Sequence, residues 1–169
     1  GIEADTLVGH SFGGRVIIQG ESTGAFRARK IVLIGSAGIA IRNTTRNLLF
    51  KIGAKIGNAV LSIPPFSFWK AKLRKKLYTR IGSDYADVGA LRETFVKTIS
   101  EDLSESAKKI TAPALLIWGK NDIETPLADG ERLSRLIPRA TLEVIAGAGH
   151  FVHGEKSEEV ARLIKTFVC

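Results

Sequence analysis

A serine near the start of the chain has the spacing of a catalytic nucleophile. Residues 9–13 read Gly-His-Ser-Phe-Gly, which is the pattern G-x-S-x-G with Ser11 at its centre. This pattern places a serine on a sharp turn between a strand and a helix, with its hydroxyl exposed. We expect Gly9 and Gly13 to relieve the crowding that side chains would cause in such a turn. The alternative interpretation is an ordinary glycine-rich turn with an exposed serine.

A serine hydroxyl needs a base to take its proton and donors to hold the oxyanion that forms. The sequence offers candidates for each role. We expect the backbone N–H of Phe12 to be one oxyanion donor. His150 is the predicted general base, which then acts as general acid. Asp122 is predicted to orient His150 and to stabilise its imidazolium form. The order along the chain is therefore Ser, Asp, His.

Other residues near these motifs allow alternative assignments. Glu124 lies two residues past Asp122 and is the alternative acid. We expect His10 to pack beneath the serine turn and His153 to serve its loop or a cap, and neither is the predicted base. No pair of histidines or cysteines has metal-ligand spacing on a helix, so we expect no metal site and no cofactor.

The elements that must position these residues follow from apolar patterning. Four apolar segments predict buried strands, at 5–9, 31–34, 114–118 and 141–145. Helical patterns predict three helices. The first spans 12–23, the second begins at Pro126 with Thr125 as its cap and ends near 138, and the third is C-terminal with Ser157 as its cap. This alternation predicts an α/β fold with a parallel sheet. Ser11, Asp122 and His150 then follow the carboxyl ends of their strands, at one edge of the sheet.

One crossover is much longer than the others. We assign 1–39 and 110–169 to the core and 40–109 to an inserted helical cap over the carboxyl ends of the strands. Phe66 and Trp69 are expected in the core of that cap rather than as substrate-stacking groups. The cap is basic: ten Lys or Arg and no Asp or Glu lie at positions 42–80, within a net charge of +8. A solvated helix face is the favoured interpretation; an anionic substrate or a membrane surface stays possible, and we expect no nucleic-acid partner.

Three motifs in order resemble those of one family. GHSFGG at 9–14 resembles the nucleophile elbow of α/β-hydrolase-fold enzymes, WGKNDIETP at 118–126 their acid loop, and GAGHFVHGE at 147–155 their histidine loop. Residues 82–103 resemble cap sequences of bacterial members. The resemblance implies strands five to eight of the family's eight-stranded sheet, with the cap between strands six and seven. It also implies a serine hydrolase that acts on an ester- or amide-type acyl substrate through an acyl-enzyme.

The resemblance also implies what this chain would lack. The family takes its second oxyanion donor from the loop after its third strand, and no residues here match that loop. The alternative is therefore a truncated, catalytically incompetent fragment or a binding protein. Strand 5–9 would become an exposed edge. We expect it to be covered by self-association into a homo-oligomer or by a missing N-terminal fragment.

Composition sets the remaining bounds. A chain of 169 residues suits one domain, and 44% hydrophobic with 25% charged residues is ordinary for a globular protein. The single cysteine, Cys169, permits no internal disulfide, and no secretory signal is visible. We therefore expect a cytoplasmic location. The chain contains no methionine, so Gly1 follows a removed methionine, a tag or a truncation point.

Overall fold

Four parallel strands form one sheet, in the order in which they occur along the chain. The computed structural model describes residues 1–39 and 97–169. The strands are β1 (Ile2–His10), β2 (Phe26–Ile34), β3 (Ala114–Gly119) and β4 (Ala140–Ile145). Each pairs in parallel with the next, so all four carboxyl ends meet at the same edge. The predicted parallel sheet of about four strands is confirmed.

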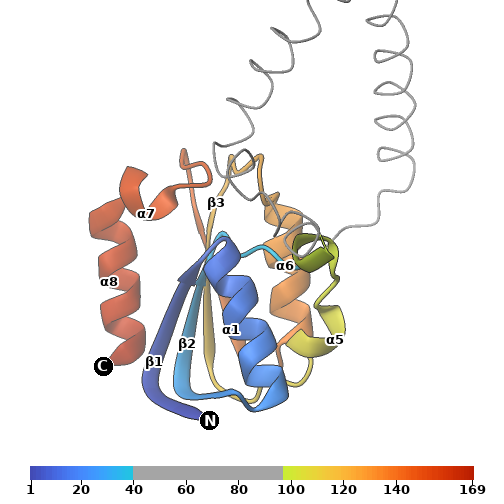
Figure 1. The fold of residues 1–169 in the computed structure, drawn as a ribbon. Helices are drawn as coiled ribbons and strands as arrows, with labels where there is room; N and C mark the ends of the chain where they lie inside the picture. The colour runs from blue at the N-terminus through green and yellow to red at the C-terminus, as the bar shows by residue number, and fades with distance from the viewer. Residues whose placement is uncertain (40–96) are drawn as a thin grey trace, which may run out of the picture. The chain divides into compact units, whose positions relative to one another are not determined.

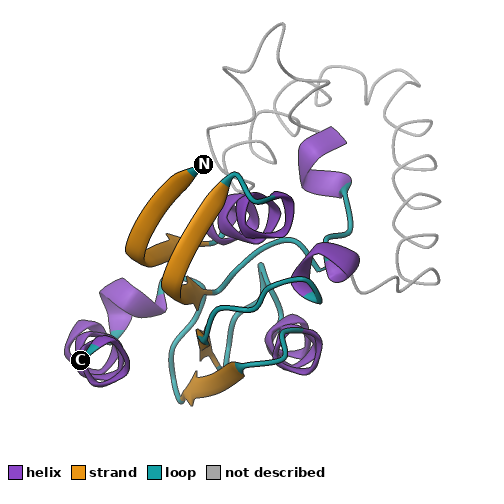
Figure 2. Ribbon diagram, turned by 90° about the horizontal axis from the view of Figure 1, so that it is seen from below, coloured by secondary structure: helices purple, strands orange, loops and turns teal. Residues whose placement is uncertain are grey.

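Helices cover both faces of this sheet, as predicted. They are α1 (Phe12–Thr23), α5 (Ser104–Ala107), α6 (Leu127–Leu136), α7 (Val152–Glu155) and α8 (Ser157–Val168). In Figures 1 and 2, α1, α5 and α6 lie on one face and α8 on the other. The bounds of α1 are those predicted from the sequence, because the turn at Ser11 begins it and Gly24, with φ 75°, ends it in a left-handed conformation.

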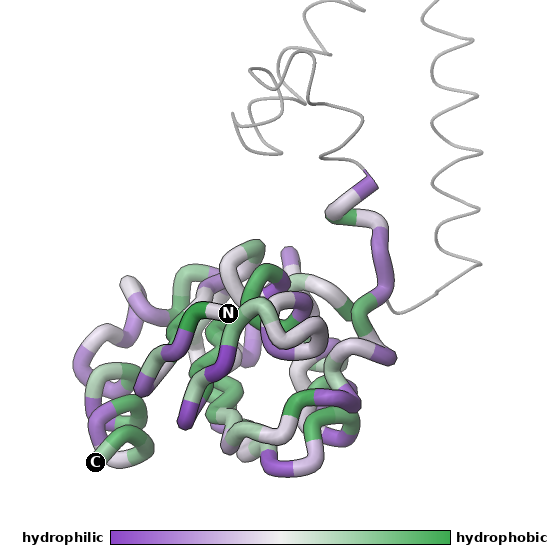
Figure 3. The backbone as a smooth tube through the Cα atoms, turned by 60° about the horizontal axis from the view of Figure 1, so that its bottom comes forward, coloured by the Kyte–Doolittle hydropathy of each residue, from purple (hydrophilic) through white to green (hydrophobic). Residues whose placement is uncertain are grey.

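The two inner strands are apolar on both sides because both sides are covered. Along β2, Ile31 and Leu33 pack with α1 and α6, while Val32 and Ile34 pack toward α8. Alternate residues of a strand point to opposite faces, which produces these two separate cores. Trp118 at the end of β3 is fully buried in the first core. Figure 3 shows apolar and polar stretches alternating along α8, whose apolar stripe closes the second core.

β1 differs from the inner strands because it forms one edge of the described sheet. It pairs with β2, and Leu7 packs against the first core. On β1, Ile2 is 62% exposed and Val8 is 53% exposed. Within the described residues, one face of β1 therefore presents apolar side chains without a helix over them.

Two predicted helix caps are wrong. Helix α6 begins at Leu127 after Pro126, with no side-chain capping bond, because the hydroxyl of Thr125 is turned toward β2 and the Asp122 carboxylate instead. Ser157 is the first residue of α8 rather than its cap. Only Lys156 separates α7 from α8, so the chain re-enters a helical conformation at once.

Several predictions fall outside the described residues. These are the structure of the predicted cap at 40–96, the placement of Phe66 and Trp69, and the basic cluster at 42–80. The chain divides into two compact units, one of Gly1–Ala40 with Ile99–Cys169 and the other of Ile41–Thr98. In the first unit, Leu103 and α5 pack in the core beneath α1 and α6. Residues 99–109, which the sequence analysis assigned to the cap, therefore pack with the core unit. Among the described helices, none is both long and apolar enough to cross a bilayer.

Candidate active site

Ser11 occupies a strained turn between β1 and α1. Its backbone has φ 50° and ψ −111°, the one positive φ of a non-glycine residue in the described part of the chain. Such a conformation costs about 1–3 kcal/mol and persists only where the surroundings hold it. Here the N–H of Ser11 donates to the carbonyl of Ile34 at 3.0 Å, and the N–H of Ala37 donates to the carbonyl of Ser11 at 3.0 Å. The end of β2 thus fixes the turn from both sides.

Glycines let β1, α1 and β2 approach one another closely at this turn. A Cβ at Gly9 would lie 2.7 Å from the backbone carbon of Gly13 and 2.7 Å from Cδ1 of Ile17. The expected crowding at Gly13 is wrong, because a Cβ there would project into open space. Gly14 is instead the tight position, since its Cβ would overlap the side chain of Ser36. The sequence shows the Gly13-Gly14 pair, but it does not show that Ser36 packs against Gly14.

The structure brings Ser11, His150 and Asp122 into hydrogen-bond distance of one another. Nδ1 of His150 lies 2.8 Å from Oδ2 of Asp122, and Nε2 lies 3.0 Å from Oγ of Ser11. A carboxylate only accepts hydrogen bonds, so the proton belongs on Nδ1. Nε2 then carries the lone pair and accepts from the serine hydroxyl. The side chains of His150 and Asp122 are 5% and 0% exposed.

The acid loop holds Asp122 through its own backbone. The N–H groups of Glu124 and Thr125 both donate to Oδ1 of Asp122 at 2.9 Å. The hydroxyl of Thr125 lies 2.8 Å from Oδ2 of Asp122 and 3.2 Å from Nδ1 of His150. The indole N–H of Trp118 donates to the carbonyl of Thr125 at 2.8 Å. Thr125 is therefore a residue of the site that the sequence analysis assigned to a helix cap.

Gly35 is a second residue of the site that the sequence analysis did not identify. It follows β2 with φ 47°, and its N–H donates to the carbonyl of Ile117 at 2.9 Å. A Cβ at this position would lie 3.3 Å from both Oδ2 of Asp122 and Nδ1 of His150. Glycine adopts this backbone conformation without strain, and a side chain here would press against the pair. A glycine directly after a predicted strand was the signal available in the sequence.

The histidine loop is tied to the acid loop. The N–H groups of Lys120 and Asn121 donate to the carbonyls of Ile145 and Ala148, each at 2.9 Å. The carboxylate of Glu155 on α7 accepts from the N–H of Gly149 at 2.8 Å. The backbone that carries His150 is thus held by the turn after β3 and by α7.

His10 contacts the histidine loop from the other side of the serine turn. Its Nε2 lies 3.1 Å from the carbonyl of His150, and its ring packs 4.8 Å from the His150 ring and 4.4 Å from the His153 ring, between centroids. Burial lowers the pKa of His10, and the charges of His150 and His153 act in the same direction. A carbonyl oxygen only accepts hydrogen bonds, so Nε2 of His10 is the donor in this contact. His10 therefore supports the histidine loop rather than only packing beneath the turn.

Glu124 faces the other nitrogen of His150. Its Oε2 lies 3.6 Å from Nε2, the nitrogen next to Ser11, and its side chain is 60% exposed. Asp122 holds Nδ1, the position of an orienting acid. The geometry therefore favours Asp122 for that role over the alternative of Glu124.

Phe12 is the first residue of α1 and directly follows Ser11. Its backbone N–H belongs to the first turn of a helix, where amides point toward the N-terminus and the helix dipole favours negative charge. This is the setting that oxyanion stabilisation requires.

Among the residues that the structure describes, no group of three potential metal ligands is found.

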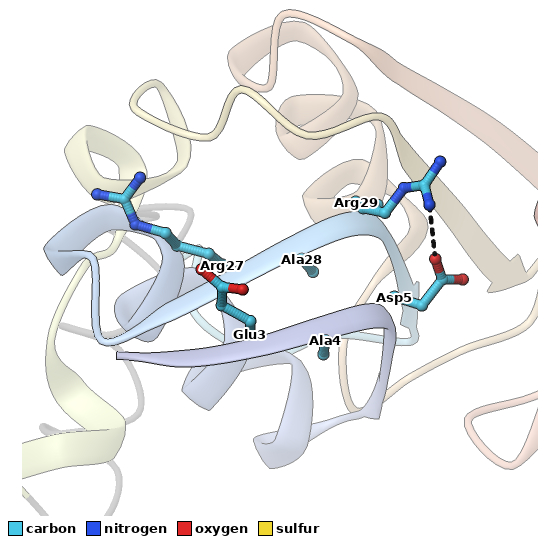
Figure 4. A pocket seen from close by; sticks show the side chains of 6 residues that line it. All are labelled: Glu3, Ala4, Asp5, Arg27, Ala28 and Arg29. Carbon is cyan, nitrogen blue, oxygen red and sulfur yellow. Dashed lines mark ion pairs between the residues drawn. The ribbon is translucent and has the colours of Figure 1, made fainter.

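A surface hollow lies away from this site. It is lined by Glu3, Ala4, Asp5, Arg27, Ala28 and Arg29 in the amino-terminal halves of β1 and β2. Arg29 and Asp5 form an ion pair at this hollow, with 3.5 Å between Nη1 and Oδ1 (Figure 4). Their side chains are 85% and 72% exposed. It contains no nucleophile or base of the Ser-His type, and Ser11 follows the opposite end of β1. The contacts among Ser11, His150 and Asp122 therefore lie at the other end of the sheet from this hollow.

One protein family matches nearly the whole chain. The family model described as the alpha/beta hydrolase family matches residues 1–163. The chain therefore belongs to the alpha/beta hydrolase family.

Particular relatives have related sequences. The hydrolase YugF of Bacillus subtilis strain 168 is 25% identical over 180 residues, which cover 99% of this chain and 66% of YugF. The 2-hydroxy-6-oxo-2,4-heptadienoate hydrolase of Pseudomonas putida is 27% identical over 174 residues, covering 96% of this chain and 63% of that protein. The chain thus spans about two thirds of the length of these curated relatives.

Solved structures share the fold. MGS-MChE2, an alpha/beta hydrolase enzyme from a sediment metagenome of the Mar Chica lagoon in Morocco, matches with a TM-score of 0.61 and 22% identity, covering 96% of this chain and 59% of that one. A mutant of the meta-cleavage product hydrolase CumD from Pseudomonas fluorescens IP01 matches with a TM-score of 0.59 and 24% identity, covering 95% and 62%.

Proposed function

We propose that this chain carries the serine, histidine and aspartate of a hydrolase that cleaves an ester- or amide-type acyl substrate through an acyl-enzyme. One observation carries the proposal. The hydroxyl of Ser11, the ring of His150 and the carboxylate of Asp122 form a continuous line of hydrogen-bond contacts, 3.0 and 2.8 Å long. The hydrolases among the relatives support the reaction class.

The proposed reaction has two halves. Oγ of Ser11 attacks the acyl carbon while its proton passes to Nε2 of His150, and Asp122 stabilises the imidazolium that results. The N–H of Phe12 donates to the oxyanion of the tetrahedral intermediate. The intermediate collapses when the leaving group departs with the proton from Nε2. Water then attacks the acyl-enzyme, gives a proton to Nε2, and the proton returns to Oγ as the acid product leaves.

A second candidate is a chain that keeps these residues without turning over substrate. In that case Ser11 is held by the same contacts, but the oxyanion is stabilised too weakly. Loss of one oxyanion donor costs about 10²–10³-fold in rate.

The test is hydrolysis of p-nitrophenyl butyrate by the wild-type chain, Ser11→Ala and the control Ser22→Ala, which changes a partly exposed serine in the last turn of α1. Oligomer size is recorded by light scattering, since β1 is an exposed edge. We expect turnover that Ser11→Ala abolishes and Ser22→Ala retains. Equal background in all three proteins would instead support the second candidate.

A further inference from the structure

The carboxylate of Glu124 lies beside the atom from which a leaving group takes its proton. Oε2 of Glu124 is 3.6 Å from Nε2 of His150, and Oγ of Ser11 is 3.0 Å from the same nitrogen. A general acid must come within hydrogen-bond reach of the atom that it protonates. The leaving group and the Glu124 carboxylate are therefore neighbours when the acyl bond breaks.

Glu124 has a fixed backbone and an open side chain. Its N–H donates to Oδ1 of Asp122 at 2.9 Å, which holds the residue in the acid loop. Its side chain is 60% exposed, so its charge meets whatever enters from solvent. Within residues 1–39 and 97–169, the one ion-pair contact of this carboxylate is to His150. No described lysine or arginine neutralises it at the salt-bridge distance.

From this placement we infer that Glu124 makes the site select substrates whose leaving group is cationic, such as esters of amino alcohols or of quaternary ammonium alcohols. The inference rests on the proposed function, because it concerns the leaving group of that reaction. A positive group near Nε2 is attracted by the Glu124 carboxylate, while a leaving group that carries a carboxylate is repelled by it. At a partly exposed position, a unit charge about 4–6 Å away supports a preference of about three- to tenfold.

Two isosteric esters isolate the charge. Butyrylcholine and 3,3-dimethylbutyl butyrate differ in one atom, a quaternary nitrogen in place of a quaternary carbon, and share the same acyl group. The quantity measured is the ratio of kcat/KM for the charged ester to kcat/KM for the neutral one. It is compared between the wild-type chain, Glu124→Gln and the control Glu3→Gln, which removes an exposed carboxylate at the opposite end of β1.

We expect the ratio to fall about three- to tenfold in Glu124→Gln and to stay unchanged in Glu3→Gln. In the wild-type chain the preference should also shrink at about 1 M salt, where the Debye length is about 3 Å. A ratio that Glu124→Gln leaves unchanged, while both esters are hydrolysed, overturns the inference and leaves the proposed function intact.

If neither ester is hydrolysed, that result counts against the proposed function. A binding measurement then still tests the inference. Choline and 3,3-dimethylbutanol are titrated into the wild-type chain and Glu124→Gln, with the His150 ring resonances followed by NMR. We expect choline to bind the wild-type chain about three- to tenfold more tightly than the alcohol, and the difference to vanish in Glu124→Gln. Equal affinities in the wild-type chain, or no binding of either ligand, overturn the inference.

Discussion

The two nitrogens of the His150 ring face two differently built regions. On the Nδ1 side, Asp122 is fully buried and is contacted by two backbone N–H groups, a threonine hydroxyl and the imidazole. Gly35 brings β2 against the same pair. On the Nε2 side, Ser11 is partly exposed and the side chain of Glu124 is 60% exposed. One side is enclosed by the fold, and the other is open to a substrate.

This difference separates orientation from selectivity. Hydrogen bonds in a buried, low-dielectric region are strong, and a missing partner there is costly. Changes on the Nδ1 side should therefore affect both folding stability and the proposed reaction. Charges on the Nε2 side are screened by water. Changes there should alter the preference among substrates and leave stability nearly unchanged.

The largest effect is expected from Asp122→Asn, which breaks the enclosed side. An amide in place of the carboxylate can present its NH₂ to Nδ1 and so move the imidazole proton to Nε2, which then no longer accepts from Ser11. We expect kcat for p-nitrophenyl butyrate to fall about 10⁴-fold. The far-ultraviolet circular dichroism spectrum checks that the variant still folds. A loss below tenfold would mean that the open side alone suffices for catalysis.

A smaller effect is expected from Thr125→Val, which keeps the shape of the side chain but removes its hydroxyl. That oxygen lies 3.1 Å from the carbonyl of Gly35 in addition to its contacts with Asp122 and His150. Without the hydroxyl, the Gly35 carbonyl, the Asp122 carboxylate and the His150 ring each lose one buried polar partner. This loss should lower the free energy of unfolding by about 1–3 kcal/mol. Urea denaturation measures the change. Thr125→Ser keeps the hydroxyl and should retain most of the stability; equal loss in both variants would point to packing instead.

The smallest effect concerns a second carboxylate near the enclosed side, that of Asp129 on α6. Burial raises the pKa of Asp129 to about 6, and the negative charge of Asp122 contributes in the same direction. Among the described residues, Oδ1 of Asp129 is buried without a hydrogen-bond partner. The native state therefore binds a proton more tightly than the unfolded chain, and stability falls as the pH rises from about 4 through 6.

Asp129→Asn removes that charge. We expect it to raise the free energy of unfolding by about 1 kcal/mol at pH 8, after allowance for the partial exposure of the group, and to change it little at pH 4. Urea denaturation at both pH values tests the sign. A variant that is less stable than the wild type at pH 8 would contradict the assignment of a destabilising charge to Asp129.

Much of the scaffold was predictable because it depends on local patterns. Apolar runs identified the cores of all four strands, and their alternation with helices identified a parallel sheet. The i, i+3, i+4 spacing from Val160 onward placed the buried stripe of α8 correctly. The strand ends were less well predicted: β1 begins at Ile2 and β2 at Phe26, in polar sequence where pairing with a neighbour extends the strand.

The sequence by itself determined the order of Ser11, Asp122 and His150 and the edge of the sheet at which they lie, because parallel strands bring their carboxyl ends together. Only the tertiary structure decided which atoms meet. It turned Thr125 from a helix cap into a contact of the Asp122–His150 pair, left no room for a side chain at Gly14 and little at Gly35, and set Glu124 beside Nε2 rather than Nδ1. Loop residues far apart in sequence are brought together by strand register and helix packing, which spacing along the chain does not encode.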